Sequence, residues 1–314
     1  MYLPSKEELL SCHERIKPFV HRTPVLKSRK LNEISGAEIY FKCENFQRMG
    51  AFKMRGACNA ILSLNEAERS RGVVTHSSGN FAQAVSLAAK ELGIPAYIVM
   101  PSTAPEVKIK AVKEYEGKVI ICPPTLEDRE QYAQNIVYEK GAKFLHPSND
   151  IDVILGQGTA AVELLEDHKD LDHLMTPVGG GGLVAGSALA VKYLGMDCSC
   201  IGAEPKAADD AFRSLKSGKI ETNESANTIA DGLRTTLGSN NFPIIKELLK
   251  EIICVEEEEI VYAMRLIWER MKIIIEPSCA VPFAALLKEK EHFKGKKIGI
   301  VLSGGNVDLE KLPF

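Results

Sequence analysis

Short apolar segments alternate with amphipathic helical patterns along most of this 314-residue chain. Each apolar segment is about the length of one strand, and most of them end in turn residues. Because helical patterns separate them, the segments are expected to pair in parallel sheets that helices cover on both faces. The sequence therefore predicts an α/β fold. The expected strands lie within the segments 37–44, 72–78, 95–101, 118–124, 142–147, 173–178, 200–205 and 297–304, most of which include turn residues at their ends.

These strands are too many for one sheet of ordinary size, so we predict two sheets and two domains. The strand and helix units between residues 72 and 147 follow one another through tight loops and can form one compact sheet. No linker rich in Pro, Gly or Ser flanks them. We therefore expect a small domain, residues 69–149, inserted into a large domain, residues 1–68 and 150–314.

Charge and composition exclude several classes of partner. The net charge is −3, and 45% of the residues are hydrophobic, which argues against nucleic acid or an anionic membrane surface. No apolar run reaches the ~18 residues that a membrane-spanning helix needs, and the N-terminal segment lacks the apolar core of a secretory signal. The eight cysteines contain no C-x-x-C pair, which favours a reducing compartment. A cytoplasmic protein is expected.

Polar residues follow two of the expected strands at the point where each strand ends. Ligands of open parallel sheets bind beyond the carboxyl ends of the strands, so these turns are candidate sites. In the segment 75–80, Ser77, Ser78 and Asn80 precede an expected helix, whose free N–H groups can bind an anion. Ordinary capping of that helix is the alternative explanation. After the last expected strand, Ser303 lies in a similar turn.

Four consecutive glycines, Gly179–Gly182, follow another strand. Glycine lets backbone amides approach a ligand closely, which suits a phosphate group at the start of a helix. The same stretch, read as Gly180-x-Gly182-x-x-Ala185 with Glu204 about twenty residues later, also fits the fingerprint of dinucleotide-binding folds. A nicotinamide-dependent oxidoreductase therefore remains an alternative at this point.

Lys53 lies close to an expected helix start near Ala51. The positive end of the helix, the neighbouring cation Arg55 and desolvation by Phe52 would each disfavour the ammonium form. Such a lysine has a lowered pKa and can act as a nucleophile that forms an imine. An ordinary surface lysine on an amphipathic helix is the alternative.

Taken together, these features resemble the fold-type II pyridoxal phosphate enzymes, specifically the serine racemase and serine/threonine dehydratase family. The resemblance implies a tryptophan synthase β-like fold, in which the active site lies between two open parallel-sheet domains. The motifs that carry it run through the chain in order: Thr23–Val25, Glu44–Gln47, Gly50–Gly56, Ser77–Asn80, Gly156–Thr159, Gly179–Leu183, Ile229–Gly232, Glu276–Pro277 and Ser303–Asp308.

The resemblance assigns roles in cofactor and substrate binding. Lys53 would hold pyridoxal 5'-phosphate covalently as an imine and would exchange the substrate α-proton on one face. Ser78 would act as the second acid or base on the opposite face. The other implied cofactor residues are Phe52, Asn80, Gly179, Gly180, Gly181, Gly182, Leu183, Glu276 and Ser303, and the implied substrate residues are Ser77, Ser78, Asn80 and Asp231.

A divalent cation and an oligomer are also implied. Glu204, the carbonyl of Ala208 and Asp210 would bind Mg²⁺, or alternatively Ca²⁺ or Mn²⁺. The competing explanation is that Asp209 or Asp210 only caps the following helix. The family suggests a homodimer, and its mammalian-type members bind ATP as an effector, for which we assign no residues. Phe81 stands where many relatives have histidine.

The implied activity is the interconversion of L- and D-serine, with β-elimination of serine to pyruvate and ammonia. Ser303 is a neutral partner for the pyridine nitrogen, which favours proton exchange and elimination over transamination. Threonine/serine dehydratase and 3-hydroxyaspartate dehydratase are alternatives with the same chemistry. A catalytically silent protein that senses a ligand is the non-enzyme alternative.

Overall fold

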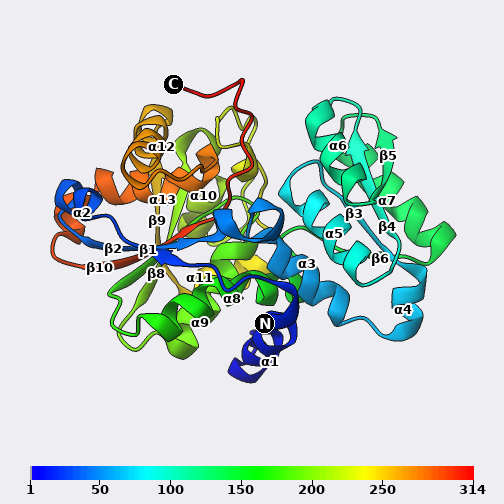
Figure 1. Cartoon of the computed structure of the whole chain (residues 1–314), viewed down its shortest axis with the longest axis horizontal. Helices are drawn as coiled ribbons and strands as arrows, with labels where there is room; N and C mark the ends of the chain where they lie inside the picture. The colour runs from blue at the N-terminus through cyan, green and yellow to red at the C-terminus, as the bar shows by residue number, and fades with distance from the viewer. Residues whose placement is uncertain (1) are drawn as a thin grey trace.

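The structure, a computed structural model, describes residues 2–314 and contains two sheets with helices on both faces (Figure 1). The larger sheet has six strands in the order β1-β2-β10-β7-β8-β9. Only β1 runs antiparallel to its neighbour, and the other pairs are parallel, which confirms the predicted α/β class. The bounds are β1 Val25–Leu26, β2 Glu38–Cys43, β7 His173–Pro177, β8 Ser199–Pro205, β9 Leu249–Val255 and β10 Lys297–Leu302.

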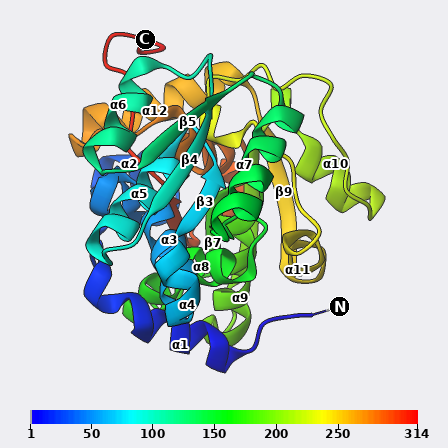
Figure 2. The same ribbon diagram turned by 90° about the vertical axis from the view of Figure 1, so that its right-hand side faces the viewer.

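The smaller sheet has four parallel strands in the order β5-β4-β3-β6. They are β3 Val73–His76, β4 Ala96–Pro101, β5 Lys118–Cys122 and β6 Lys143–Phe144. The whole sheet lies inside the range predicted for the small domain, while the exact domain boundaries stay a prediction. Helices α5 (Asn80–Glu91) and α7 (Leu126–Lys140) lie on opposite sides of this sheet (Figure 2).

Helices cover both faces of the large sheet as well. Leu174 and Met175, adjacent on β7, point to opposite faces and enter two different apolar clusters. The first cluster lies under α8 and α9, and the second under α12 and α13. The helices outside the small sheet are α1 Lys6–Ile16, α2 Arg29–Ser35, α3 Lys53–Leu62, α4 Glu66–Arg71, α8 Ile151–Asp167, α9 Gly182–Leu194, α10 Asp210–Ser217, α11 Asn241–Leu248, α12 Glu257–Met271, α13 Pro277–Lys288 and α14 Lys290–Phe293.

Two strands of the large sheet were not predicted. β1 has only two residues, and β9 begins directly after α11 without a turn signal between them. β9 is also an edge strand with a half-exposed pattern, so neither a continuous apolar run nor a clear alternation marks it. The eight cysteines are all free, and no helix within residues 2–314 is long and apolar enough to cross a membrane.

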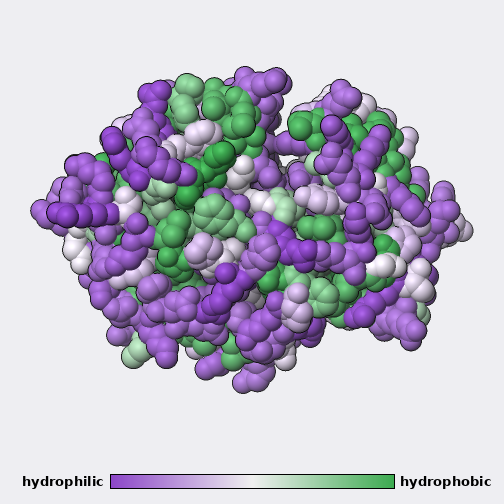
Figure 3. Space-filling model, viewed as in Figure 1, coloured by the Kyte–Doolittle hydropathy of each residue, from purple (hydrophilic) through white to green (hydrophobic). Residues whose placement is uncertain are grey.

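A notch separates the two domains on the face where α12 and α6 (Glu106–Glu114) lie (Figure 3). Helix α3 lies between the two lobes in Figure 1, and it leads from the large domain through α4 to β3. The residues predicted to form the site come from both sides of this boundary.

Candidate active site

Lys53 is the first residue of α3, two residues later than the helix start expected near Ala51. The segment before it docks on the loop that follows β10. Ala51 forms an isolated antiparallel bridge with Gly304, and the backbone N–H of Phe52 donates to the carbonyl oxygen of Ser303 at 3.0 Å. The structure therefore brings Lys53 and Ser303 together at the carboxyl end of β10.

The Lys53 amine lies between aromatic rings at the boundary of the two domains. Its Nζ donates to the carbonyl oxygen of Pro147 at 2.8 Å and lies 5.0 Å from the ring centroid of Phe52 and 5.7 Å from that of Phe81. Loss of hydration lowers the pKa of Lys53 to about 8, although the carboxylate of Glu276 acts in the opposite direction. The expected lowering is therefore present, and part of the amine is neutral and nucleophilic near neutral pH.

One predicted cause of this lowering was wrong. Arg55 does not contribute to the pKa of Lys53, because its guanidinium is held by the carboxylates of Glu44 and Glu163 at 2.7 and 2.8 Å. These partners neutralise the cation and hold it away from the Lys53 amine. The sequence showed only that Arg55 is close in the chain.

The hydroxyl-rich turn after β3 is not used to cap a helix. α5 begins at Asn80, its N-cap is Gly79, and no side chain caps it. Ser77, Ser78 and Asn80 are partly exposed, and Ser77 Oγ accepts only a long 3.4 Å bond from the Gly79 amide. The capping alternative therefore does not describe this turn, and the hydroxyls of Ser77 and Ser78 are available to a ligand at the helix N-terminus.

Asn80 connects the two domains instead. Its Nδ2 donates to both carboxylate oxygens of Glu276, at 3.1 and 3.2 Å, and its Oδ1 accepts from Asn306 Nδ2 at 2.9 Å. Burial raises the pKa of Glu276 to about 7, while the hydrogen bond from Asn80 lowers it. Asp231 and Lys108 also act electrostatically on Glu276 and form an ion pair across the boundary at 2.7 Å.

The four glycines form a narrow turn between β7 and α9. Gly181 has φ +83°, and an added methyl group at Gly180 would lie 2.4 Å from Ser148 Oγ. At Gly182 the methyl group would lie 2.3 Å from Gln157 Oε1, a buried atom without a hydrogen-bond partner in the described structure. The turn leads to Leu183 in the first turn of α9, where backbone amides are free to bind an anion. This geometry fits a phosphate group.

Residues that the sequence analysis did not single out surround this turn. Asn241 Nδ2 donates to the carbonyl oxygens of Gly180 and Ser148, at 2.7 and 2.9 Å. Gln157 Nε2 donates at 3.1 Å to the Pro147 carbonyl that also accepts from Lys53. Gln157 lies in Gly156–Thr159, one of the motifs that carry the family resemblance, so the sequence could have indicated it. Nothing in the sequence indicates Asn241 or the Pro147 carbonyl.

Glu204, Ala208 and Asp210 lie close together between β8 and α10. Both carboxylate oxygens of Glu204 accept backbone N–H groups, from Ala211 at 3.0 Å and from Phe212 at 2.8 Å. Glu204 rather than Asp209 or Asp210 therefore caps α10, which corrects the capping alternative.

The acidic pair fits a small divalent cation. Burial raises the pKa of Glu204 to about 9 and that of Asp210 to about 6, and a bound cation would stabilise their charged forms. Asp210 Oδ2 is buried without a hydrogen-bond partner, while Oδ1 accepts from Asn223 at 2.5 Å. No group of three or more His, Cys, Asp or Glu residues within 2–314 is arranged to hold a metal, so this candidate needs the Ala208 carbonyl and water as further ligands.

Comparison with known proteins agrees with the geometry. The chain is 51% identical over 310 residues to a serine racemase of Dictyostelium discoideum, covering 98% of this chain and 96% of the relative. It is 47% identical over 314 residues to a β-hydroxyaspartate dehydratase of Paracoccus denitrificans (strain Pd 1222), covering all of both chains. The structure of maize serine racemase matches with a TM-score of 0.96 at 44% identity, over 98% of this chain and 95% of that one. The model of the family described as "Pyridoxal-phosphate dependent enzyme" matches residues 16–304, and the chain therefore belongs to this family.

Proposed function

We propose that this protein interconverts L- and D-serine and also eliminates water from serine, with Lys53 as the residue that holds pyridoxal phosphate. The observation that carries the proposal is that Lys53, an amine of lowered pKa, lies at the carboxyl end of β10, where Ser303 also lies. The serine racemase of D. discoideum, which shares half its residues with this chain, supports this choice of substrate. The family match leaves the nicotinamide alternative without support.

The residues present suit each part of the cofactor. When bound, pyridoxal phosphate supplies an electron sink that makes the α-proton of an amino acid acidic. The backbone amides of Gly179–Leu183 would hold its phosphate. Asn80 would hydrogen-bond its phenolic oxygen, Ser303 would meet its pyridine nitrogen, and Phe52 would pack beside its ring. Ser303 donates or accepts without a net charge, unlike a carboxylate in the same place.

The substrate would be held where the two domains meet. Its carboxylate would bind Ser77, Asn80 and the free amides at the start of α5. Lys53 would take the α-proton from one face, and Ser78 would give a proton back on the other face. For elimination, the β-hydroxyl leaves as water, and hydrolysis of the resulting enamine gives pyruvate and ammonia.

A second candidate function is the dehydration of 3-hydroxyaspartate, the activity named for the P. denitrificans relative. Such a substrate carries a second carboxylate and needs a cation at the entrance of the site. Lys108 lies near enough to act on Glu276, although Asp231 neutralises it here. L-threonine is a further substrate of the same chemistry.

We further propose that Glu204, Ala208 and Asp210 hold Mg²⁺ and that the protein is a homodimer in the cytoplasm. The proposed cation is supported by Asp210 Oδ2, which is buried and has no hydrogen-bond partner in the described structure. The homodimer and an ATP effector rest on the family resemblance alone.

A substrate panel tests the proposal. L- and D-serine, L-threonine and both 3-hydroxyaspartate series should be incubated with the protein and pyridoxal phosphate, with Mg²⁺ and with a chelator. Formation of 2-oxo acid and inversion of configuration should both be scored. We expect both products from serine. Turnover of none of these amino acids would contradict the proposal and favour a ligand-sensing protein.

Two variants assign the roles. Lys53→Ala should lower turnover by at least about 100-fold and abolish attachment of the cofactor by borohydride. Ser78→Ala should abolish racemisation but keep dehydration of L-serine. Equal loss of dehydration with L- and D-serine would show that the two-base assignment is wrong.

A further inference from the structure

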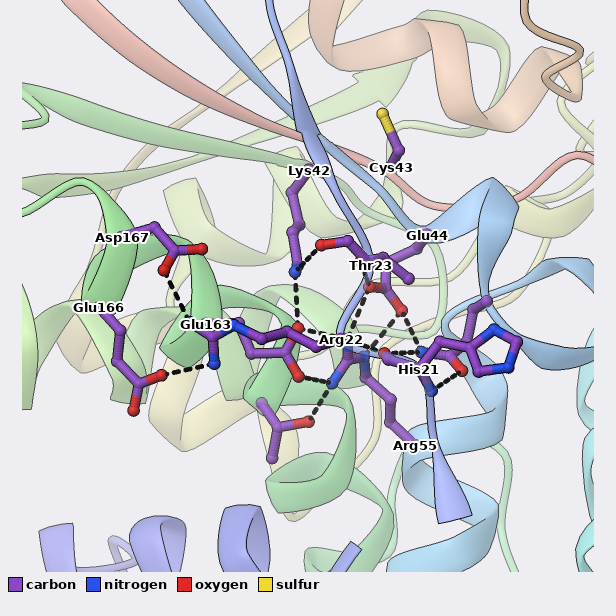
Figure 4. A network of polar contacts seen from close by, with 12 residues as sticks. His21, Arg22, Thr23, Lys42, Cys43, Glu44, Arg55, Glu163, Glu166 and Asp167 are labelled. Carbon is purple, nitrogen blue, oxygen red and sulfur yellow. Dashed lines mark hydrogen bonds and ion pairs between the residues drawn. The ribbon is translucent and has the colours of Figure 1, made fainter. Parts of the chain in front are cut away.

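A fully buried group of charged side chains lies beside the first turn of α3 (Figure 4). Arg55 donates to both carboxylate oxygens of Glu44, at 2.7 and 2.8 Å, and to both of Glu163, at 2.8 Å each. Lys42 Nζ donates to Glu163 at 2.6 Å. These residues, Lys42, Glu44, Arg55 and Glu163, are called the Arg55 cluster below.

Every partner of the cluster belongs to the segments predicted to form the large domain. Arg55 also donates to Thr159 Oγ1 and to the His21 carbonyl, both at 3.2 Å. Lys42 donates to the Thr23 carbonyl at 2.6 Å. The cluster thus connects α3 to β2, to α8 and to the extended segment before β1.

The opposite face of α3 packs on the small domain. Met54, Ala57 and Ile61 lie in one apolar cluster with residues of α5, Phe81 and Val85 among them. Beyond Leu62 the chain continues through α4 into β3 of the small sheet. Helix α3 therefore contacts both domains. Apolar contacts and chain connection tie it to the small domain. Arg55 ties its first turn to the large domain, and Asn59 Nδ2, which donates to the Asp152 carbonyl oxygen at 2.8 Å, ties its middle to α8 of the same domain.

We propose that the Arg55 cluster fixes the first turn of α3 to the large domain and so holds the Lys53 amine in position relative to the Gly179–Gly182 turn. Arg55 is then a positioning residue for Lys53. The inference rests on the proposed role of Lys53 in holding the cofactor.

Stability alone is a weak explanation for the cluster. A buried ion pair is often no more stabilising than apolar residues of the same volume, because desolvation opposes the attraction. A guanidinium held by two bidentate carboxylates, however, permits one arrangement only. A close backbone contact reinforces it, since a methyl group at Gly156 would lie 2.5 Å from the Arg55 carbonyl oxygen.

The cluster also carries no net charge that could act on Lys53. It contains two cations and two carboxylates, which balance each other. It therefore holds the first turn of α3 without adding a net charge two residues from Lys53. Displacing a reacting group by about 1 Å can cost about 100-fold in rate. The position of the Lys53 amine therefore matters for the rate, although the cluster fixes it only through the helix turn and not by direct contact.

The test is a charge-balanced double variant, Arg55→Met with Glu44→Gln, which leaves the pair of Lys42 and Glu163 intact. The rate of covalent capture of pyridoxal phosphate by the cofactor-free protein is measured from its visible absorbance and from borohydride attachment. The values of kcat and KM for L-serine are measured as well, at a temperature where circular dichroism shows folded protein. We expect capture and kcat to fall about 10- to 100-fold, with KM within about threefold.

Two further variants frame this result. Arg55→Lys keeps the positive charge but loses the bidentate hydrogen bonds of the guanidinium. Its capture rate and kcat should lie between those of the unaltered protein and those of the double variant. Arg15→Met is the matched control, because Arg15 donates to Asn59 and Ser63 at the other end of α3, both at 2.8 Å. Its rates should equal those of the unaltered protein. A folded double variant with unchanged capture and kcat would overturn the proposal.

Hydrogen exchange on the unaltered protein decides the question if the double variant does not fold. Amides of the first turn of α3 should exchange as slowly as those of β2, with and without cofactor and serine, while those of α5 change. Parallel changes in α3 and α5 would overturn the proposal. Capture of cofactor by Lys53→Ala at the normal rate would instead show that the proposed function is wrong.

Discussion

Asn80, in the small domain, holds the carboxylate of Glu276, in the large domain, through hydrogen bonds of 3.1 and 3.2 Å to its two oxygens. Glu276 is buried, has a pKa raised to about 7, and in its charged form favours the ammonium form of Lys53. The contact between the domains and the protonation state of Lys53 are therefore linked through one carboxylate.

The first prediction concerns Glu276→Gln. Removing the carboxylate removes an attraction that raises the pKa of Lys53, so that pKa should fall below about 8. Because only the neutral amine reacts, the midpoint of pyridoxal phosphate capture against pH should move to lower pH. Capture rates from pH 6 to 10 check this, with Glu33→Gln on α2 as a surface control. A midpoint that stays in place or rises would contradict it.

Lys108→Met should weaken substrate binding. The ion pair of Lys108 with Asp231 is partly exposed and crosses between the domains, and such pairs contribute about 0.2–1 kcal/mol. We expect KM for serine to rise by up to about fivefold, with less effect at high salt and little change in kcat. Lys110→Met, on the same helix, is the control. A much larger effect on 3-hydroxyaspartate than on serine would favour the second candidate function.

Gly181→Ala should destabilise the protein by about 2–4 kcal/mol. Its φ of +83° disfavours any side chain, and the methyl group would lie 2.7 Å from Leu237 Cδ2 and 2.8 Å from Asn241 Oδ1. Gly93→Ala is the matched control, with φ +66° and open space around the added methyl group. Denaturant unfolding of both variants separates the clash from the backbone strain. Equal losses would show that the turn can open to accept a side chain.

Asp210→Asn should abolish stabilisation by Mg²⁺. A cation that binds only the folded protein stabilises it by about 2.7 kcal/mol at 100 times its Kd, which raises Tm by several degrees. Asparagine can keep the hydrogen bond from Asn223 but loses the charge. Asp209→Asn, whose carboxylate pairs with Arg213, should respond to Mg²⁺ like the unaltered protein. A Tm shift retained in Asp210→Asn would place the cation elsewhere.

His173 should make the protein less stable in mild acid. Burial lowers the pKa of His173 to about 4, against about 6.5 in an unfolded chain. Between these values the unfolded chain binds more protons, so stability rises with pH across this window and the contribution is constant above it. Tm measured from pH 4 to 7 should change less in His173→Gln than in the unaltered protein, with His21→Gln, at an exposed position, as control. An unchanged slope would contradict the prediction.

The sequence was sufficient for the parts of the site that depend on strand ends. The Gly179–Gly182 turn and Ser303 follow the parallel neighbours β7 and β10, and the Ser77–Asn80 turn follows β3 of the other sheet, so each could be predicted from a strand end. Lys53 was predicted from its expected helix start and from the family motif. Arg55 was misjudged because residues two apart on a helix point in different directions, and because its partners Glu44 and Glu163 are distant in sequence. Only the fold shows which carboxylates neutralise a cation, and the same holds for Glu204 capping α10.

The position of β10 in the large sheet has a consequence for synthesis of the protein. This strand pairs with β2 on one side and β7 on the other, yet it is the last strand along the chain. All four strands of the small sheet have been synthesised once Phe144 has been added, so this sheet can form early on the ribosome. β2 and β7 can be joined in the large sheet only after β10 has been synthesised. Since Ser303 follows β10 directly and bonds to Phe52, a nascent chain should capture its cofactor only after the last strand has emerged.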